Sequence, residues 1–287
     1  MDLNPRSPTR GDHRLAERPN RVLFISSMEA VDFYVYRELS RRVPGLRAVH
    51  LGPKADPPAE SRVTRIRKHP VRSIRGALRD RVLGPLDAAT ERAVAKRLFG
   101  SSEFPAGELE AAEVVRIPID RINHPDTVQI VQAMRPDLMI VCGAPILRAP
   151  ILGVAPQGAF NVHWGIAPDY RGADSIFWAV HDGAFEKIGV TVHRISAVID
   201  GGAIVAQRTV QATPASSEAD LWVACARLLP ELLTDLVVQA AHGEVVAHRQ
   251  PDAGRTFRYE ERTVGAVVRS ALRRWQRARS TPTPTPS

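Results

Sequence analysis

The segment "GAFNVHWGIAPDYRG", residues 158–172, places two polar side chains in a short apolar run. Asn161 and His163 stand two residues apart, so in a strand their side chains point to the same face. A third polar side chain, Asp200, lies in a glycine-rich turn, "IDGGA", between two apolar segments. Ligands of open α/β sheets gather beyond the carboxyl ends of the strands, and we expect these three groups to meet there.

An amide, an imidazole and a carboxylate together suit acyl transfer. The amide N–H can donate to an oxygen that becomes negative when a carbonyl is attacked. The imidazole can do the same or carry a proton, and the carboxylate can fix its tautomer, hold a water or take a proton from the nucleophile. No G-x-S-x-G segment, the pattern of a serine nucleophile, is present. Each residue also has a structural alternative: a capping asparagine, a core histidine and an aspartate that serves only its turn.

The elements that must position these groups alternate between strands and helices. Apolar runs predict strands at 21–27, 47–52, 136–144, 158–163, 188–195 and 202–210. A helix is expected after the first strand, where apolar residues recur every four positions, and another over 123–134, with Asn123 as its cap. The order predicts an α/β fold: a Rossmann-like, open, mostly parallel sheet with helices on both faces.

The expected organisation has four parts. Residues 1–20 and the Thr-Pro segment 280–287 are expected to be disordered tails. Residues 21–210 form the main domain, in which 53–118 is interpreted as a basic, partly helical insertion. Residues 211–279 form a small, mainly helical C-terminal extension, with a break or kink near Pro230 and a short β piece within 254–261.

Composition and charge restrict the class of protein. The hydrophobic fraction of 44% and charged fraction of 24% are those of an ordinary globular protein, and no apolar stretch is long enough for a membrane span. The formal charge of +8 concentrates in 62–81 and 269–280, which favours polyanions but equally suits a solvated surface. Cys142 and Cys225 lie in apolar runs without metal-ligand spacing. We expect a cytoplasmic protein with no metal and no integral membrane association.

Several motifs follow one another between residues 136 and 207. After the pair Asn161 and His163 come "APDYRG", "WAV", "GVTVH" and "DGGAIVAQ", in that order. In this order they resemble the catalytic domain of the folate-dependent formyltransferases, with weaker agreement over 21–52 and 123–137. The resemblance implies that 21–210 is a formyltransferase-like catalytic domain.

The resemblance also implies roles for individual residues. Asn161, His163 and Asp200 would form the catalytic group, with 10-formyltetrahydrofolate as the formyl donor and cofactor. The pterin of the donor would lie against five residues, through backbone or apolar surface: Cys142, Gly143, Ile146, Leu147 and Ile199. The residues expected to contact the amine acceptor are Ser26, Ser27, Trp164, Tyr170 and Arg171.

Two departures from the family pattern bear on the acceptor. Trp164 and Gly165 stand where members usually have Pro-Ser, which alters the loop that shapes the acceptor pocket. The first strand ends in "SSMEAVD" rather than in the glycine-rich phosphate loop of the glycinamide ribonucleotide enzymes, which disfavours a phosphoribosyl acceptor. "RGADSIFWA" resembles instead the methionyl-tRNA and sugar-nucleotide N-formyltransferases.

Between these two branches, a small amine is the preferred acceptor, such as an amino sugar nucleotide or another biosynthetic amine. The tRNA formyltransferases carry a C-terminal β-barrel, and the mainly helical sequence after Val210 is expected not to form one, so tRNA ranks second.

Three other readings stay open. The chain could be a non-catalytic folate-binding relative or a formyltetrahydrofolate hydrolase, although hydrolases normally bear an N-terminal regulatory domain for which residues 1–20 leave no room. It could also bind membranes peripherally through the basic helix 263–279. We expect that helix to pack on the domain instead, through Val267, Leu272 and Trp275.

Overall fold

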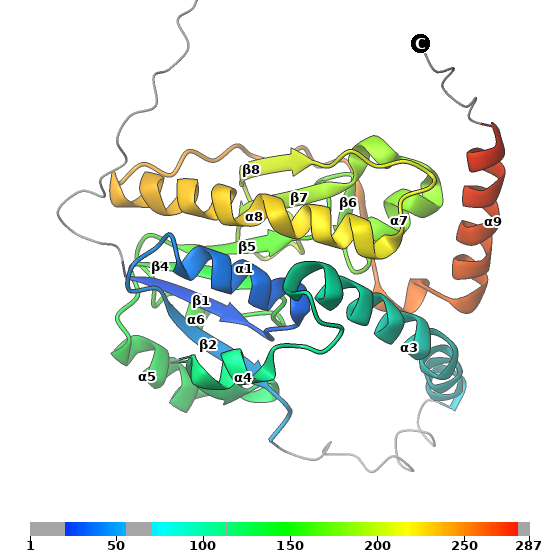
Figure 1. Cartoon of the computed structure of the whole chain (residues 1–287). Coiled ribbons are helices and arrows are strands. Elements are labelled where there is room, and N and C mark those ends of the chain that lie inside the picture. Colours follow the sequence, from blue (N-terminus) through cyan, green and yellow to red (C-terminus); the bar gives the residue numbers. More distant parts are fainter. Residues whose placement is uncertain (1–20, 56–69, 113, 281–287) are drawn as a thin grey trace, which may run out of the picture.

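A seven-stranded sheet forms the centre of the computed structural model, which describes residues 21–55, 70–112 and 114–280. The strand order is β3-β2-β1-β4-β5-β7-β8 (Figure 1). The strands are β1 (Val22–Ser26), β2 (Arg47–Gly52), β3 (Val114–Pro118), β4 (Leu138–Cys142), β5 (Ala159–His163), β7 (Gly189–Arg194) and β8 (Ile204–Thr209). β1 to β5 pair in parallel, and β7 and β8 add an antiparallel hairpin at one edge. The predicted open, mostly parallel sheet is confirmed.

Helices cover both faces of this sheet because its strands are apolar on both sides. In β1, Val22 and Phe24 belong to one core, whereas Leu23 and Ile25 belong to the other. The first core lies under α1 (Ala30–Ser40), α7 (Ser175–Asp182) and α8 (Glu218–Ala241), and the second under α5 (Pro125–Ala133) and α6 (Ala149–Leu152). Short 3₁₀ helices are η1 (Ile119–Arg121), η2 (Phe185–Lys187) and η3 (Tyr259–Glu261).

The segment interpreted as an insertion contributes to the main sheet. It contains one long helix, α3 (Pro70–Phe99), the short helix α4 (Ala106–Ala111), and β3, which pairs with β2. The strand at 114–118 was not predicted, because a run of five residues with a charged side chain in its middle lacks a clear strand pattern; in the structure it is largely half-exposed. The basic residues at 62–69 lie outside the described part of the chain.

The C-terminal extension is likewise part of the main core. α8 continues through Pro230 without a break, and Leu229, Leu233 and Leu236 are fully buried against the sheet. The expected β piece is confirmed as β9 (Arg255–Phe257), which pairs in parallel with β6 (Tyr170–Gly172). This chain segment therefore crosses the loop that follows β5.

The last helix, α9 (Val264–Ser280), packs through a different face from the one expected. Leu272 and Trp275 are exposed, whereas Ala266 and Ser270 are buried and Val267 is half-buried. The expectation that Leu272 and Trp275 pack on the domain is wrong. The reason is that the last carbonyls of α7 lie under α9 and accept hydrogen bonds from its arginines. Arg277, for example, donates to the carbonyl oxygen of Asp182 at 3.0 Å.

The terminal tails are only partly covered by the structure. Residues 1–20 and 281–287 lie outside the described residues, and Ser280 ends α9. Among the helices described, none combines the length and the apolar character needed to cross a membrane.

Candidate active site

Strand pairing brings Asn161 and His163 next to a second histidine. β5 and β7 are antiparallel, and Asn161 lies directly opposite His193. Residues that face each other across antiparallel strands point to the same side of the sheet. Accordingly, Asn161 Nδ2 lies 3.3 Å from His193 Nε2. The two predicted side chains therefore share their face with an imidazole that was not predicted.

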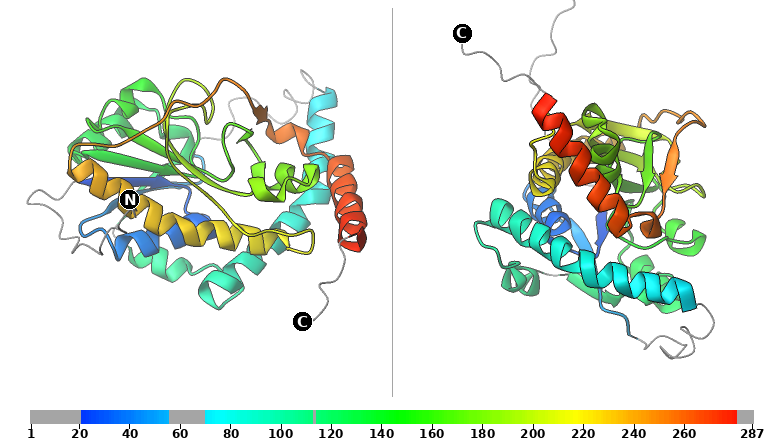
Figure 2. Two further views of the ribbon diagram at one scale, coloured as in Figure 1. Left: turned by 90° about the horizontal axis from the view of Figure 1, so that it is seen from above. Right: turned by 90° about the vertical axis from the view of Figure 1, so that its right-hand side faces the viewer.

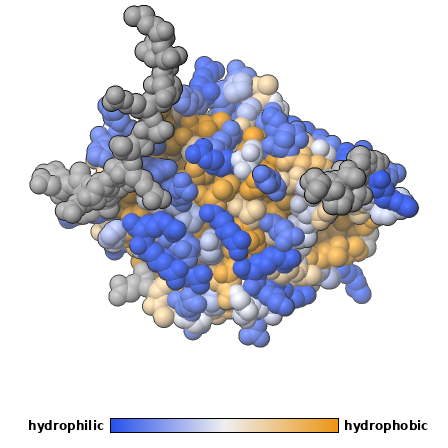
Figure 3. All heavy atoms as spheres, turned by 45° about the horizontal axis from the view of Figure 1, so that its top comes forward, coloured by the Kyte–Doolittle hydropathy of each residue, from blue (hydrophilic) through white to orange (hydrophobic). Residues whose placement is uncertain are grey.

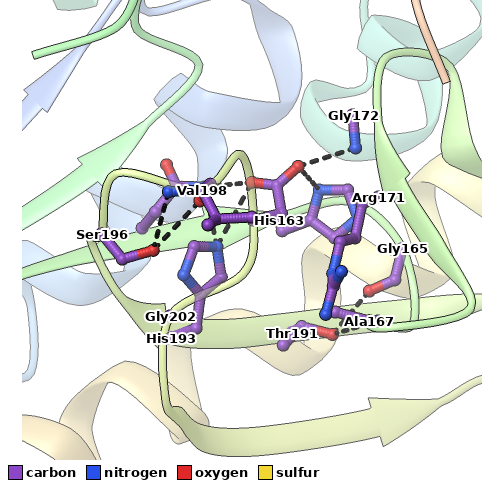
Figure 4. A network of polar contacts seen from close by, with 12 residues as sticks. His163, Gly165, Ala167, Arg171, Gly172, Thr191, His193, Ser196, Val198 and Gly202 are labelled. Atoms are coloured by element: carbon purple, nitrogen blue, oxygen red, sulfur yellow. Dashed lines mark hydrogen bonds and ion pairs between the residues drawn. The ribbon is translucent and has the colours of Figure 1, made fainter. Parts of the chain in front are cut away.

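Asp200 closes the group from the turn between β7 and β8. It has a left-handed backbone conformation, with φ of 48°, and the turn is tight because a Cβ at Gly202 would lie 1.7 Å from the carbonyl oxygen of Arg194. The glycine therefore serves the turn itself rather than the approach of a ligand. The carboxylate of Asp200 reaches His163, 37 residues earlier in the chain, with Oδ2 3.1 Å from His163 Nδ1 (Figure 4).

Four groups surround the carboxylate of Asp200. Asn161 Nδ2 donates to Oδ1 at 3.2 Å, and His193 Nε2 lies 3.3 Å from the same oxygen. The backbone N–H of Gly172 donates to Oδ2 at 2.8 Å. Burial by itself would raise the pKa of Asp200, but the bond from His193, the charges of the histidines and the Gly172 N–H outweigh it and hold the pKa below its usual value. The carboxylate is therefore ionised at neutral pH.

His163 lies between two hydrogen-bond acceptors. Besides Asp200, the carbonyl oxygen of Tyr170 lies 2.6 Å from its Nε2. Burial nevertheless lowers the pKa of His163, against the opposing effects of Asp200 and this carbonyl. The ring is therefore neutral at pH 7, with one proton to share between two acceptors. A second proton would satisfy both, so the surroundings are suited to accept one transiently.

A pocket of about 220 Å³ adjoins this group. It lies between the loop after β4 and the loop that carries Asp200, and Asn161 and His193 form part of its wall. Three of the five residues predicted to contact the pterin line it: Ile146, Leu147 and Ile199. The other two, Cys142 and Gly143, are not among its lining residues. The pocket is mainly apolar with polar groups at one end, the usual character of a small-molecule site.

Comparison with known proteins bears on this arrangement. Residues 106–237, which include Asn161, His163 and Asp200, match the family model described as formyl transferase. Over these residues the chain is similar to the formyl transferase family. This agrees with the resemblance found in the sequence, and the family model reaches into α8, which forms part of the same core.

Individual relatives agree with the family match. The methionyl-tRNA formyltransferase of Chlorobium chlorochromatii (strain CaD3) is 29% identical over 147 residues, 50% of this chain and 46% of that protein. The chain spans about half the length of the curated relatives it matches.

Solved structures show the same fold at low sequence identity. A 4-N formyltransferase from Francisella tularensis superposes with a TM-score of 0.56 at 12% identity, over 89% of this chain and 87% of that chain. A sugar N-formyltransferase from Shewanella sp FDAARGOS_354 gives 0.56 at 13% identity, over 90% and 88%. WlaRD, a sugar 3N-formyl transferase solved in the presence of dTDP and 5-N-formyl-THF, gives 0.52 at 10%, over 90% and 80%. The fold of the formyl transferase domain is therefore shown.

Cys142 and Gly143 have structural roles in this domain. The thiol of Cys142 is fully buried and donates to Asp32 Oδ1 at 3.2 Å. Gly143 adopts φ of 62°, and a Cβ there would lie 2.1 Å from Asp32 Oδ2. Its carbonyl accepts from the backbone N–H of Ser27 at 3.1 Å. Both residues hold the start of the loop that follows β4, and neither is among the residues that line the pocket of about 220 Å³.

The residues expected to contact the acceptor are divided between buried and accessible positions. Ser26 is fully buried and accepts from the backbone N–H of Met28 at 2.8 Å. Ser27 lines a pocket of about 350 Å³ beyond the end of β1. Trp164 is half-buried and packs on Trp222 of α8, with ring centroids 5.2 Å apart. Of this set, Ser27 has the clearest access to a pocket.

Gly165 explains one departure from the family pattern. A Cβ at this position would lie 2.5 Å from Ser175 Cβ and 2.7 Å from His163 Nε2. The chain after His163 therefore passes too close to the imidazole for any side chain here. Glycine at 165 and the packing of Trp164 give this loop its own course.

The side chains of Tyr170 and Arg171 are buried and contact residues that support the Asp200 turn and β6. The Tyr170 ring stacks on Phe257 at 5.7 Å, and burial beside Asp182 raises the pKa of Tyr170 to about 12. Arg171 donates to Gln250 Oε1 at 2.8 Å. The side-chain amide of Gln250 in turn donates to the carbonyl of Asp200 at 2.7 Å. Both side chains are buried, and the expected contact of Tyr170 and Arg171 with the acceptor stays a prediction.

Three residues near the site were missed by sequence reasoning. His193 ends the "GVTVH" motif, and its place opposite Asn161 follows only from the strand register. Gln250 lies in an irregular segment with no recognisable pattern. Asn123 does not cap α5, whose N-cap is His124, but donates to the carbonyl of Ile146 at 2.9 Å and accepts from the Arg148 N–H at 2.8 Å. It thereby shapes the loop after β4, which lines the pocket of about 220 Å³.

Within the described ranges, no group of three or more His, Cys, Asp or Glu side chains is arranged to hold a metal ion. The carboxylate of Asp200 accepts hydrogen bonds from Asn161 and from the backbone N–H of Gly172.

Proposed function

We propose that this chain transfers a formyl group from 10-formyltetrahydrofolate to a primary amine. The observation that supports this most is the meeting of Asn161, His163 and Asp200 beside a pocket of about 220 Å³. The family match agrees with formyl transfer, and the presence of 5-N-formyl-THF with WlaRD agrees with a folate donor.

The pocket of about 220 Å³, which we call the donor-side pocket, has the chemistry that a pterin requires. Ile146 and Ile199 are exposed apolar side chains on the two loops that line the pocket, and the buried Leu147 also forms part of its wall. A flat heterocycle buries apolar area between such side chains, while backbone groups of the two loops remain for its polar edge. When bound there, the folate supplies the formyl carbon that the amine attacks.

Each polar side chain of the group then has a defined task. Asn161 Nδ2 donates to Asp200 and also lies 3.3 Å from His193 Nε2, so one N–H of this amide can turn from the histidine toward an oxygen in the pocket that gains negative charge. Both ring nitrogens of His163 face acceptors, and the ring is not among the residues that line the pocket. His163 can therefore donate to the same oxygen or accept a proton from the attacking amine once Nε2 releases the Tyr170 carbonyl, while Asp200 stabilises the charged ring. The ionised Asp200 orients both.

The acceptor proposed is a small amine, such as an amino sugar nucleotide or another biosynthetic amine. The pocket of about 350 Å³ beside Ser27 lies at the same sheet edge as the donor-side pocket, and its size is that of a small-molecule site. Glu29, Glu91 and Arg92 line it. An amine and a phosphate group would therefore each find an opposite charge there.

A charged tRNA is the second candidate acceptor. It is favoured by the name of the relatives, methionyl-tRNA formyltransferase, and by the formal charge of +8. It is not favoured by a pocket of small-molecule size. The two acceptors are separated by one experiment.

The test incubates the purified chain with 10-formyltetrahydrofolate and a panel of amino sugar nucleotides, free amines and methionyl-tRNA. Tetrahydrofolate release and a mass gain of one formyl group on one amine are the expected result. His163→Ala and Asp200→Asn should lower kcat by about 100-fold or more, the usual effect of losing such a group. His242→Ala, at an exposed position after α8, is the matched control. Full turnover by His163→Ala would contradict the proposal, and formylation of the tRNA alone would move it to the second candidate.

A further inference from the structure

The outward face of α9 carries an apolar stripe that no described part of the chain covers. Val268, Leu272 and Trp275 are 52%, 56% and 57% exposed. Their spacing of four and three residues aligns them along one side of the helix. α9 lies over the front of the molecule in the right-hand panel of Figure 2, and hydrophobic side chains reach the surface at the matching right-hand edge of Figure 3. We call these three residues the outer stripe of α9.

The helix is held with this stripe outward by contacts on its other face. Arg274 donates to the carbonyl of Ser216 at 2.7 Å, and Arg277 donates to the carbonyl of Asp182 at 3.0 Å. Ala266 and Ser270, one to three turns earlier in the helix, are buried. Rotation of α9 to bury the stripe would break these charge-assisted bonds and leave helix-terminal carbonyls without donors. The exposure of the stripe is therefore a property of the fold.

The charges beside the stripe are all positive. The sequence of α9 contains no acidic residue, and Arg269 and Arg279 are exposed next to the apolar side chains. The guanidinium of Arg279 lies 4.5 Å above the Trp275 ring. The aliphatic part of an arginine side chain adds apolar surface, while its guanidinium group binds anions. A partner that complements this face must offer apolar contact together with negative charge.

Neither a second copy of α9 nor the sequence of the terminal and internal segments outside the described ranges offers such a partner. A second copy of α9 would set arginines against arginines. The sequence at 1–20 has four arginines against three acidic residues, and 56–69 has four basic residues against two acidic ones. Residues 281–287 have no charged side chain. These segments would not neutralise the face.

We propose that the outer stripe of α9 docks on the surface of an anionic lipid bilayer. A single exposed helix face is convex, which suits a flat surface better than a peptide that needs a groove. Such a helix lies in the plane of the membrane, with its apolar side chains between headgroups and acyl chains and its arginines at the lipid phosphates. Trp275 has the amphipathic ring typical of that boundary. The docking is peripheral and leaves the formyl transferase domain at the surface.

The test is sedimentation of the full chain with vesicles of phosphatidylcholine alone and of phosphatidylcholine with phosphatidylglycerol at a 3:1 ratio. Binding is expected only to the anionic vesicles, with loss of binding as salt screens the arginines. A blue shift of tryptophan fluorescence should accompany it, because Trp275 is the most exposed of the four tryptophans. The double variant Leu272→Glu and Trp275→Glu should lower the partition constant by about 100-fold.

The matched control places the same charges elsewhere. Ile130→Glu and Val246→Glu also replace exposed apolar residues, on α5 and after α8, away from α9 in Figure 1. This double variant should bind like the unsubstituted chain, and circular dichroism should show all three proteins folded. Absence of binding to anionic vesicles at low salt, or equal binding by the stripe variant, would overturn the proposal. So would concentration-dependent dimerisation that the stripe variant abolishes, because a second copy would then cover the stripe.

Discussion

Replacing Asp32 by asparagine is expected to make the protein's stability less sensitive to a rise in pH from 5 to 8. Asp32 is fully buried in the first turn of α1, where its carboxyl accepts from the Cys142 thiol at 3.2 Å and from Ser27 Oγ at 3.4 Å. Burial, with a smaller effect of Glu29, raises the pKa of Asp32 to about 7 and outweighs these hydrogen bonds. The folded protein therefore keeps a proton on Asp32 at pH values where the unfolded chain has lost it.

The size and sign of the effect follow from this difference in pKa. Between pH 4 and pH 7 the folded state binds more protons at this site than the unfolded state, so the free energy of unfolding falls as pH rises. With a folded pKa of about 7 and an unfolded value of 3.8, the loss between pH 5 and pH 8 is roughly 3 kcal/mol. Asparagine cannot ionise and escapes this loss.

Urea unfolding followed by circular dichroism at several pH values measures the effect directly. The difference in unfolding free energy between the Asp32→Asn variant and the unsubstituted chain should grow by roughly 3 kcal/mol from pH 5 to pH 8. Subtraction removes the contributions of all other titrating groups. Asp252→Asn, whose side chain is 94% exposed, is the matched control and should give a flat difference. A flat difference for Asp32→Asn would refute the reasoning, because it would mean that the buried carboxyl carries no raised pKa.

Two further predictions concern buried polar contacts. Gln250→Leu should lower kcat about tenfold or more with little change in the donor KM. The reason is that leucine cannot donate to the Asp200 carbonyl or accept from Arg171, so the Asp200 turn is less firmly held. Steady-state kinetics of the variant measure this, and an unchanged kcat would contradict a positioning role. Arg262→Met should lower the free energy of unfolding by about 3–5 kcal/mol, since the buried guanidinium bridges three carboxylates, on α3, just before α7 and at the start of α8. Urea unfolding at pH 7 measures the loss. A loss below about 1 kcal/mol would show that these ion pairs contribute little.

Much of the fold could be predicted because it depends on local patterns. The apolar run of β4 and the alternation around Asn161 and His163 predict strands directly, since side-chain period and burial on both faces are written in the residues themselves. β3 escaped prediction because a half-exposed edge strand lacks that pattern and forms only by pairing with β2.

The least predictable feature was the orientation of α9. Its amphipathic pattern predicts that the apolar face packs inward, as in most surface helices. The structure places arginines inward instead, because the carbonyls that end α7 need donors. Neither the position of those carbonyls nor their lack of partners is visible in the sequence of α9.

The sequence by itself determined which chemical groups are present and which of them share a face. Asn161 and His163 point the same way in any strand, and the turn at Asp200 requires its glycines wherever the hairpin lies. Only the tertiary structure decided that His193 and Gln250 complete the group while Cys142 and Tyr170 support it from within the core. The physical reason is that a residue's type and spacing set its local geometry, whereas its partners depend on which distant segments burial forces together.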